Sequence, residues 1–199
     1  MKLVVRELTK RLGGKPVLRG LSLEVADGET VAVVGPNGSG KSTLLRIVAG
    51  VLAPESGDVF LDDASLLRDP SLRRHVGYLP EGADPLPHLS VNELLSLTAT
   101  LRRASPPPEA LLSRLGVDSI AHQRLGTLSL GQRRRACLAA ALIGDPWLLV
   151  CDEPTNGLSV DGVTELAKLL RERGKSCLVA THDAAFAESV GARIVRLGV

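Results

Sequence analysis

The sequence predicts an α/β protein with a mostly parallel sheet flanked by helices, an N-terminal antiparallel β region and a helical subdomain. Short apolar bursts separated by glycine turns fill residues 1–34, which indicates strands joined by tight turns. Helix and strand patterns alternate over residues 128–199, which favours a parallel sheet covered on both faces. Residues 81–127 carry helical periodicity instead. We therefore expect one domain spanning 1–199, in which 1–80 and 128–199 form the α/β core and 81–127 the helical subdomain.

The first half is expected to contain five strands and one helix. The strands are predicted at residues 3–5, 21–25, 30–34, 58–61 and 75–79. Between the third and fourth of these, Leu44, Leu45, Ile47 and Val48 lie on one face of a short helix that begins after the glycine-rich segment. That helix is expected to end at Gly50.

The second half is expected to be richer in helices. Ser90 followed by Glu93 is a capping-box pattern that opens a helix, which fades at Arg102 and Arg103 before a run of three prolines. A second short helix is predicted at 109–115. Further helices at 131–143, 163–173 and 184–190 alternate with strands at 147–151, 176–180 and 193–197.

Composition narrows the class of protein. Hydrophobic residues make up 44% of the chain, which is enough to fill a core, and no apolar stretch approaches the roughly 20 residues needed to cross a bilayer. The first residues carry no charged leader with an apolar core, so we expect no export signal and a cytoplasmic location. The three cysteines, Cys137, Cys151 and Cys177, are widely spaced within apolar segments and are expected to be buried small hydrophobes.

Charge and aromatic content argue against nucleic acid as a ligand. Lys plus Arg outnumber Asp plus Glu by only 24 to 22, and aromatics make up 2% of the residues. The run Arg133, Arg134 and Arg135 is the one local basic cluster of note. On a helix these side chains point around a wide arc, so we expect a solvated face beside an anionic ligand.

A glycine-rich loop is the strongest functional signal. It fits the pattern G-x-x-x-x-G-K-[ST] and consists of Gly35, Pro36, Asn37, Gly38, Ser39, Gly40, Lys41, Ser42 and Thr43. Glycines let the backbone approach phosphate oxygens and aim its N–H groups at them, and a helix N-terminus adds partial positive charge. Lys41 would hold the β and γ phosphates of ATP, and Ser42 would ligate Mg²⁺. The alternative is a turn with an exposed lysine, which the flanking strand and helix disfavour; the loop predicts a P-loop NTPase.

Two carboxylates follow the strand predicted at 147–151. Open α/β sheets bind ligands at the carboxyl ends of their strands, so Asp152 can reach the Mg²⁺ and Glu153 can polarise the attacking water. Such a pair alone is more often a solvated strand end. The preceding phosphate loop reverses that preference.

Two weaker signals accompany these. Ser129 and Gly131, followed by Gln132, precede a helix and are able to offer a hydroxyl and N–H groups to an anion, although an ordinary helix cap explains them equally well. His182 follows another predicted strand, where a lone histidine is usually a surface residue.

Taken in order, the segments 35–43, 128–132, 152–155 and 181–183 resemble those of the ATP-binding cassette (ABC) family of ATPases over nearly the whole chain. The resemblance implies a dimer of cassettes, a homodimer or a heterodimer. In it, ATP lies between the phosphate loop of one subunit and Ser129, Gly131 and Gln132 of the other. It also implies that His182 contacts the γ phosphate and that residues 156–161 link the two sites.

The sequence departs from the family pattern at four positions. Leu130 stands where the signature usually has glycine, and Ser159 replaces the usual aspartate of the linking loop. Glu81 occupies the slot of a glutamine near the metal, where a carboxylate still ligates but adds negative charge. Leu12 falls where an aromatic residue commonly stacks on adenine, so we expect GTP to compete well with ATP.

The resemblance implies the energising subunit of a transporter, peripheral on the inner face of the cell membrane and docked to a membrane-spanning subunit through the helical subdomain. The sequence of residues 78–81 resembles the corresponding segment of exporter subunits, including those of the haem-exporter and multidrug types. We therefore expect export. One alternative is a soluble ABC ATPase of cluster assembly, repair or translation. Another is a binding-only half of a heterodimer, which Ser159 and Leu130 favour and which intact Lys41, Glu153 and His182 oppose.

Overall fold

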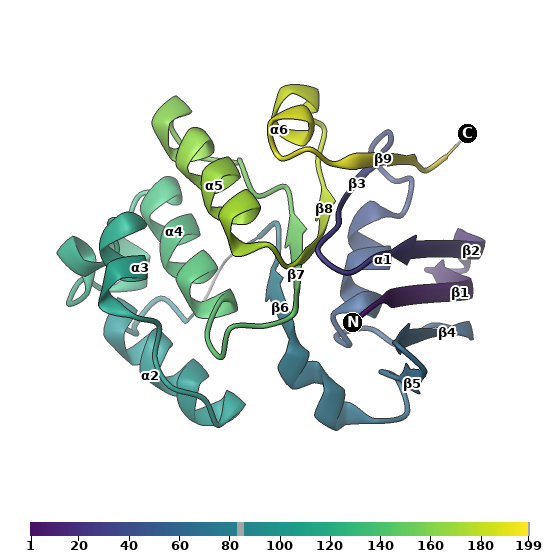
Figure 1. Ribbon diagram of the computed structural model, residues 1–199, viewed down its shortest axis with the longest axis horizontal. Helices are drawn as coiled ribbons and strands as arrows, with labels where there is room; N and C mark the ends of the chain where they lie inside the picture. Colours follow the sequence, from purple (N-terminus) through teal and green to yellow (C-terminus); the bar gives the residue numbers. More distant parts are fainter. Residues whose placement is uncertain (83–85, 199) are drawn as a thin grey trace.

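The computed structural model of the protein describes residues 1–82 and 86–198, so residues 83–85 of the expected helical subdomain lie outside the described residues. It contains an antiparallel sheet at one end and a parallel sheet in the middle (Figure 1). The first is antiparallel with the strand order β2-β1-β4-β5, and consists of β1 (Leu3–Leu12), β2 (Lys15–Val25), β4 (Ser56–Leu61) and β5 (Ala64–Ser65). The second is parallel with the order β6-β7-β8-β3-β9, and consists of β3 (Thr30–Val34), β6 (Val76–Leu79), β7 (Leu148–Asp152), β8 (Ser176–Ala180) and β9 (Arg193–Arg196). The predicted combination of an antiparallel region and a parallel sheet is confirmed.

The β1–β2 hairpin is much longer than the apolar bursts predicted. Strand β1 runs on to Leu12 and β2 begins at Lys15, joined by Gly13 and Gly14 with φ of 56° and 78°. Positive φ at both positions suits the two-residue turn that matches the twist of a hairpin. The added length is polar because one face of this antiparallel sheet is solvated, so hydropathy alone missed it.

Helices cover the parallel sheet. They are α1 (Lys41–Val48), α2 (Val91–Arg102), α3 (Glu109–Arg114), α4 (Leu130–Ala141), α5 (Val160–Arg173) and α6 (Ala184–Ser189), with 3₁₀ turns at Pro70–His75, Asp118–Ile120 and Leu125–Thr127. The predicted capping box is present at α2: the Ser90 hydroxyl accepts from the Glu93 N–H, and the Glu93 carboxylate accepts from the Ser90 N–H at 2.7 Å. No helix among the described residues combines the length and the apolar character needed to cross a membrane.

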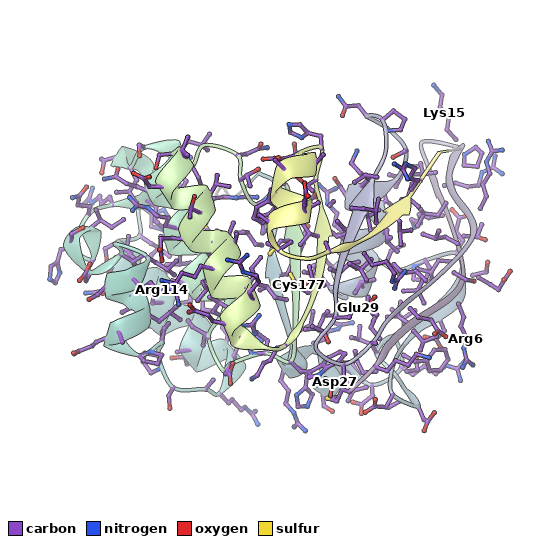
Figure 2. The ribbon with its side chains drawn as sticks, turned by 45° about the horizontal axis from the view of Figure 1, so that its top comes forward. Arg6, Lys15, Asp27, Glu29, Arg114 and Cys177 are labelled. Carbon is purple, nitrogen blue, oxygen red and sulfur yellow. The ribbon has the colours of Figure 1, made fainter. Side chains whose placement is uncertain are left out.

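Helix α1 lies between the two sheets, whereas α2, α3 and α4 gather on the far side of the parallel sheet (Figure 1). The predicted apolar face of α1, Leu44, Leu45, Ile47 and Val48, is completely buried. Arg114, labelled in Figure 2, ties α3 to α5 through ion pairs with two glutamates of α5. The fold thus holds α1 and the helical segment against opposite sides of one sheet.

The pairing register of the parallel strands decides which loops lie next to one another. Asp152 at the end of β7 pairs with Ala180 at the end of β8, and Val33 near the end of β3 pairs with the same Ala180. On the other side, Leu79 at the end of β6 pairs with Cys151. The segments that follow β3, β6, β7 and β8 therefore emerge side by side at one edge of the sheet.

The cysteines behave largely as expected. Cys151 and Cys177 are buried on neighbouring strands and are free thiols. Cys137 on α4 is only half-buried, which corrects the expectation of a buried residue at that position.

Candidate nucleotide-binding site

The glycine-rich loop connects β3 to α1, and two of its glycines are required by the geometry. Gly40, at the N-cap of α1, has φ of 97°, and a Cβ there would lie 2.9 Å from the Leu18 Cδ2. A Cβ at Gly35 would lie 2.6 Å from the Leu197 carbonyl oxygen. Any larger residue at either position would push the loop away from its neighbours, so the backbone itself forms the wall of the site.

The loop folds around the ammonium group of Lys41. Lys41 Nζ donates to the carbonyl of Gly35 at 2.7 Å and to that of Pro36 at 3.1 Å, and the residue is 9% exposed. A positive charge held by two neutral carbonyls lacks a full counter-charge. Phosphate oxygens are stronger acceptors for an ammonium group than peptide carbonyls, so an incoming triphosphate competes well for this group.

A pocket of about 380 Å³ brings most of the predicted residues together. It joins the phosphate loop to the carboxylates that follow β6 and β7, with two aliphatic side chains at one side. Its lining consists of Leu12, Val17, Asn37, Gly38, Gly40, Lys41, Ser42, Thr43, Glu81, Asp152 and Glu153. The size and the mixture of fixed backbone, one cation and several acids suit a small charged ligand.

Asp152 is the residue that points most directly to a metal. It is 1% exposed, and neither of its carboxylate oxygens has a hydrogen-bond donor among the described residues. Burial raises the pKa of Asp152, the neighbouring charges of Glu81 and Glu153 act in the same direction, and the Ser42 hydroxyl opposes them. A buried carboxylate that lacks a donor is costly unless a cation pairs with it.

These residues fit Mg²⁺. The described part of the chain holds no group of three or more His, Cys, Asp or Glu arranged for a metal. Mg²⁺ does not need one, because it is usually bound by one or two carboxylates together with substrate phosphates and water. The Asp152 carboxylate and the Ser42 hydroxyl beside it are such a set.

Glu153 has an unusual backbone and a well-defined side chain. Its φ is 47°, in the left-handed region that non-glycine residues seldom adopt. Its Oε2 lies 2.9 Å from His182 Nδ1 and accepts the His182 backbone N–H at 3.3 Å. The ring of His182 is 72% exposed and does not line the pocket. His182 thus contacts the Glu153 carboxylate through both its ring and its backbone N–H, and helps to fix the orientation of that carboxylate.

The residues Ser129, Gly131 and Gln132 are not part of this pocket. They begin α4 with a capping box, in which the Ser129 hydroxyl accepts the Gln132 N–H at 3.2 Å and the Gln132 Oε1 accepts the Ser129 N–H at 2.9 Å. Ser129 is exposed. Ser129 therefore caps α4, as the simpler interpretation predicted, and is also exposed. It does not line the pocket that the phosphate loop of the same chain forms.

Two residues that depart from the family pattern, Leu130 and Ser159, lie where α4 and α5 begin. A Cβ at Gly131 would lie 2.4 Å from the Gly157 carbonyl, and one at Gly157 would lie 2.6 Å from the Leu130 Cγ, so the start of α4 is packed tightly against the segment after β7. Leu130 nevertheless remains 57% exposed. Ser159 is the N-cap of α5, where its hydroxyl accepts the Gly162 N–H at 3.3 Å.

The expectation that Arg133, Arg134 and Arg135 form a solvated face is wrong for Arg134. It is 2% exposed, and its guanidinium donates to the backbone carbonyls of four residues. These acceptors are Pro80, Glu81, Asp152 and Glu153. Helical spacing could have revealed this, since position 134 shares a face with the buried Leu138 and Ala141.

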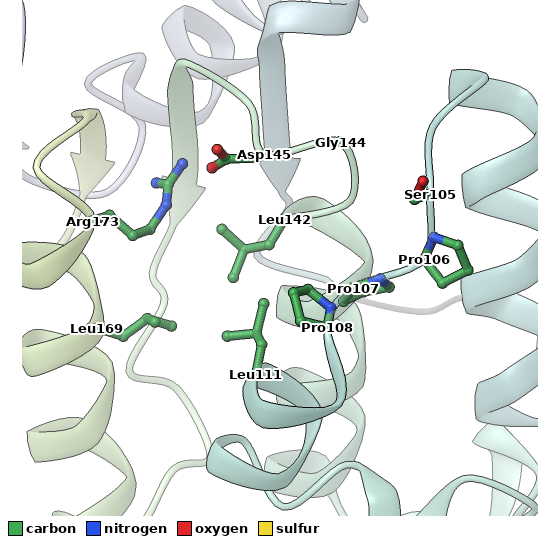
Figure 3. Close-up of a pocket in the computed structure, with 10 residues that line it drawn as sticks. All are labelled: Ser105, Pro106, Pro107, Pro108, Leu111, Leu142, Gly144, Asp145, Leu169 and Arg173. Atoms are coloured by element: carbon green, nitrogen blue, oxygen red, sulfur yellow. The ribbon is translucent and has the colours of Figure 1, made fainter.

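A larger hollow of about 460 Å³ lies at the opposite end of β7 (Figure 3). It is bounded by the proline run, the end of α4 and the side of α5, with leucine and proline side chains facing the space between them. Its residues are Ser105, Pro106, Pro107, Pro108, Leu111, Leu142, Gly144, Asp145, Leu169 and Arg173. It contains no part of the phosphate loop, so the smaller, polar pocket is the nucleotide-site candidate.

A phosphate loop between a strand and a helix, with an Asp-Glu pair at the end of another parallel strand of the same sheet, defines a P-loop NTPase. Comparison with known families agrees and is more specific. Residues 18–156 match the family described as ABC transporter. The chain belongs to this family, whose ATPases use ATP with Mg²⁺.

Individual relatives cover nearly all of the chain. The ABC transporter ATP-binding protein YdbJ of Bacillus subtilis is 34% identical over 187 residues, 89% of this chain and 60% of its own length. The zinc import ATP-binding protein ZnuC of Cereibacter sphaeroides is 38% identical over 205 residues, 98% of this chain and 78% of its own. A dimeric post-hydrolysis structure of the ATP-binding cassette MJ0796, bound to ADP and Pi, superposes with a TM-score of 0.86 at 28% identity, covering 98% of this chain and 94% of that one.

Proposed function

We propose that this chain binds and hydrolyses Mg·ATP to drive transport through a separate membrane-spanning subunit, and that it works as a dimer of cassettes at the inner face of the cell membrane. One observation carries the proposal: the buried carboxylate of Asp152, without a donor, faces the same pocket as Lys41 and the phosphate loop. Family membership and the named relatives support the transport role.

The loop and the charged residues of the pocket each have a chemical role in this proposal. The loop amides and Lys41 bind the β and γ phosphates, and Ser42 with Asp152 holds Mg²⁺. The bound metal supplies charge neutralisation on the phosphates. Glu153, oriented by His182, polarises the attacking water, and Glu81 lies beside the metal position.

A second cassette completes the site in this proposal. Ser129, Gly131 and Gln132 would act on the nucleotide held by the partner's phosphate loop, as the family resemblance implies, and His182 would contact the γ phosphate. The exposure of Ser129 and its position outside the pocket of its own chain support this arrangement. The dimeric MJ0796 cassette is a precedent in a protein of similar fold.

The direction of transport is left out of the proposal. Residues 78–81 favoured export, but the relatives do not support that prediction. ZnuC is named for zinc import, and matching relatives are named for import of phosphonates and of sulfate or thiosulfate. We propose transport without specifying its direction, with the helical subdomain at 81–127 as the part that docks the membrane subunit.

Substitution of the proposed water-polarising residue tests the hydrolytic role. Glu153→Gln keeps the shape of the side chain and removes its charge, so it should bind Mg·ATP, stop turnover and run as an ATP-dependent dimer in size-exclusion chromatography. Glu109→Gln, at an exposed position on α3, is the matched control and should behave like the parent. A Glu153→Gln protein that stays monomeric with ATP and hydrolyses it at the parent rate would show that the assignment is wrong.

Co-purification tests the transport role separately. A polytopic membrane protein retained with the tagged chain supports it. A soluble assembly, repair or translation factor recovered instead would favour the soluble ABC ATPase.

A further inference from the structure

We propose that Arg134 is a positioning residue: its guanidinium holds Glu153 in the left-handed backbone conformation that directs the carboxylate into the nucleotide pocket, and connects it to the Glu81 segment. The inference rests on the proposed role of Glu153 in hydrolysis.

The contacts of Arg134 are all to backbone carbonyls. One terminal nitrogen, Nη2, donates to the carbonyls of Asp152 and Glu153, the latter at 2.6 Å. The other, Nη1, donates to those of Pro80 and Glu81, the latter at 2.9 Å. A single side chain from α4 therefore joins the segment after β6 to the segment after β7.

The pair of bonds from Nη2 constrains the torsion angles of Glu153. The two carbonyls that it binds are consecutive, and Glu153 lies between their peptide planes. In extended chain, consecutive carbonyls point in opposite directions, and one nitrogen cannot reach both. They point to the same side when the residue between them is helical in either hand, and Glu153 has φ of 47°. The guanidinium thus favours the observed conformation over continuation of strand β7.

The left-handed conformation needs such support. A glutamate gains nothing intrinsically from φ above zero, and residues in this region persist only where their surroundings fix them. The Glu153 N–H is held by the Ala180 carbonyl at 2.8 Å and its side chain by His182, while Arg134 holds its carbonyl. Backbone donor, backbone acceptor and side chain are all fixed, so the carboxylate has one orientation.

The burial of the Arg134 guanidinium is energetically unfavourable. It is 2% exposed, its Nε lacks a partner among the described residues, and burial lowers its pKa. No carboxylate forms an ion pair with it among the described residues, although the nearby charges of Asp152 and Glu81 favour its charged form. A fully donating, planar cation suits this position because it reaches four carbonyls at once, which the point charge of lysine does not do.

Arg134→Lys tests the inference through steady-state kinetics of the full-length chain. We expect kcat to fall by roughly 10- to 100-fold, because a misplaced Glu153 no longer positions water, while KM for ATP changes by less than about threefold. Arg135→Lys, one residue along the same helix and half-exposed, is the matched control with kcat near that of the parent. In Arg134→Ala, added guanidinium ion should restore part of the lost turnover and methylammonium should not.

Several outcomes would overturn the inference. Arg134→Lys with the kcat of the parent would do so. So would a parallel loss of ATP binding, melting temperature and turnover in Arg134→Lys and in the neutral Arg134→Gln, since that pattern indicates a general folding role. If Glu153→Gln hydrolyses at the parent rate, the proposed function fails; if Glu153→Gln stops turnover and Arg134→Lys does not, the inference alone fails.

Discussion

Asp152→Asn should stabilise the nucleotide-free protein and weaken its stabilisation by Mg·ATP. The substitution keeps the size of the side chain and removes a negative charge. That charge is buried, has no donor among the described residues and lies near two further carboxylates, Glu81 and Glu153. The structure therefore places a cost on the Asp152 carboxylate that a bound cation would relieve.

The size of the effect follows from the burial. An unsatisfied neutral polar group costs about 1–3 kcal/mol and a charged one costs more, so the change from carboxylate to amide should raise the free energy of unfolding by about 1–2 kcal/mol. In a chain of this length each kcal/mol shifts the melting temperature by about 2–4 °C. We expect an increase of roughly 2–8 °C without nucleotide.

Bound Mg·ATP should reverse the order of the melting temperatures of the parent and Asp152→Asn. A ligand at 100 times its Kd stabilises the folded state by about 2.7 kcal/mol, which exceeds the gain from removing the charge. The parent should gain this stabilisation with Mg·ATP. Asp152→Asn should gain less, because it lacks the carboxylate that holds Mg²⁺. Differential scanning fluorimetry with EDTA, with Mg²⁺ alone and with Mg·ATP measures all three states.

Asp63→Asn serves as the control, because Asp63 is exposed in the turn between β4 and β5. It should leave both melting temperatures unchanged. The reasoning fails if Asp152→Asn lowers the melting temperature in EDTA, or if it retains the full shift of the parent with Mg·ATP.

Three further predictions concern the surroundings of the site. Because the base side of the pocket carries Leu12 and no stacking aromatic, GTP should compete with ATP with a Ki close to the Kd for ATP; a strong preference for ATP in competition binding would contradict this. Gly131→Ala should lower the melting temperature by roughly 2–12 °C, because its Cβ would meet the Gly157 carbonyl at 2.4 Å, and an unchanged melt would show that the segment yields. Ser159→Ala should cost about 1 kcal/mol in chemical denaturation by removing the N-cap bond to Gly162, whereas Ser159→Asp should restore it.

Local chemistry was enough to predict the phosphate loop, the capping box at Ser90 and a helix cap at Ser129. The glycines at 35 and 40 are required by close approach and by a positive φ, and the serines at 90 and 129 cap helices through bonds to residues three positions away. Such interactions join residues that are close in sequence, so a sequence motif is enough to predict them.

Long-range packing decided the rest. The meeting of Glu81 and Asp152 with the loop depends on the register of β6, β7, β8 and β3, to which residues more than 70 positions apart contribute. No local pattern specifies this register. The acceptors of Arg134 could not be predicted for a similar reason: its place on the helix indicates burial, but the carbonyls that accept from it come from two other loops.

The sequence by itself therefore determined which residues are chemically able to bind phosphate and metal, because that ability belongs to residue types and their local spacing. Only the tertiary structure decided which of them share one pocket, which lie outside it at Ser129, and how Glu153 is held, because those relations depend on strand register and on contacts between distant segments.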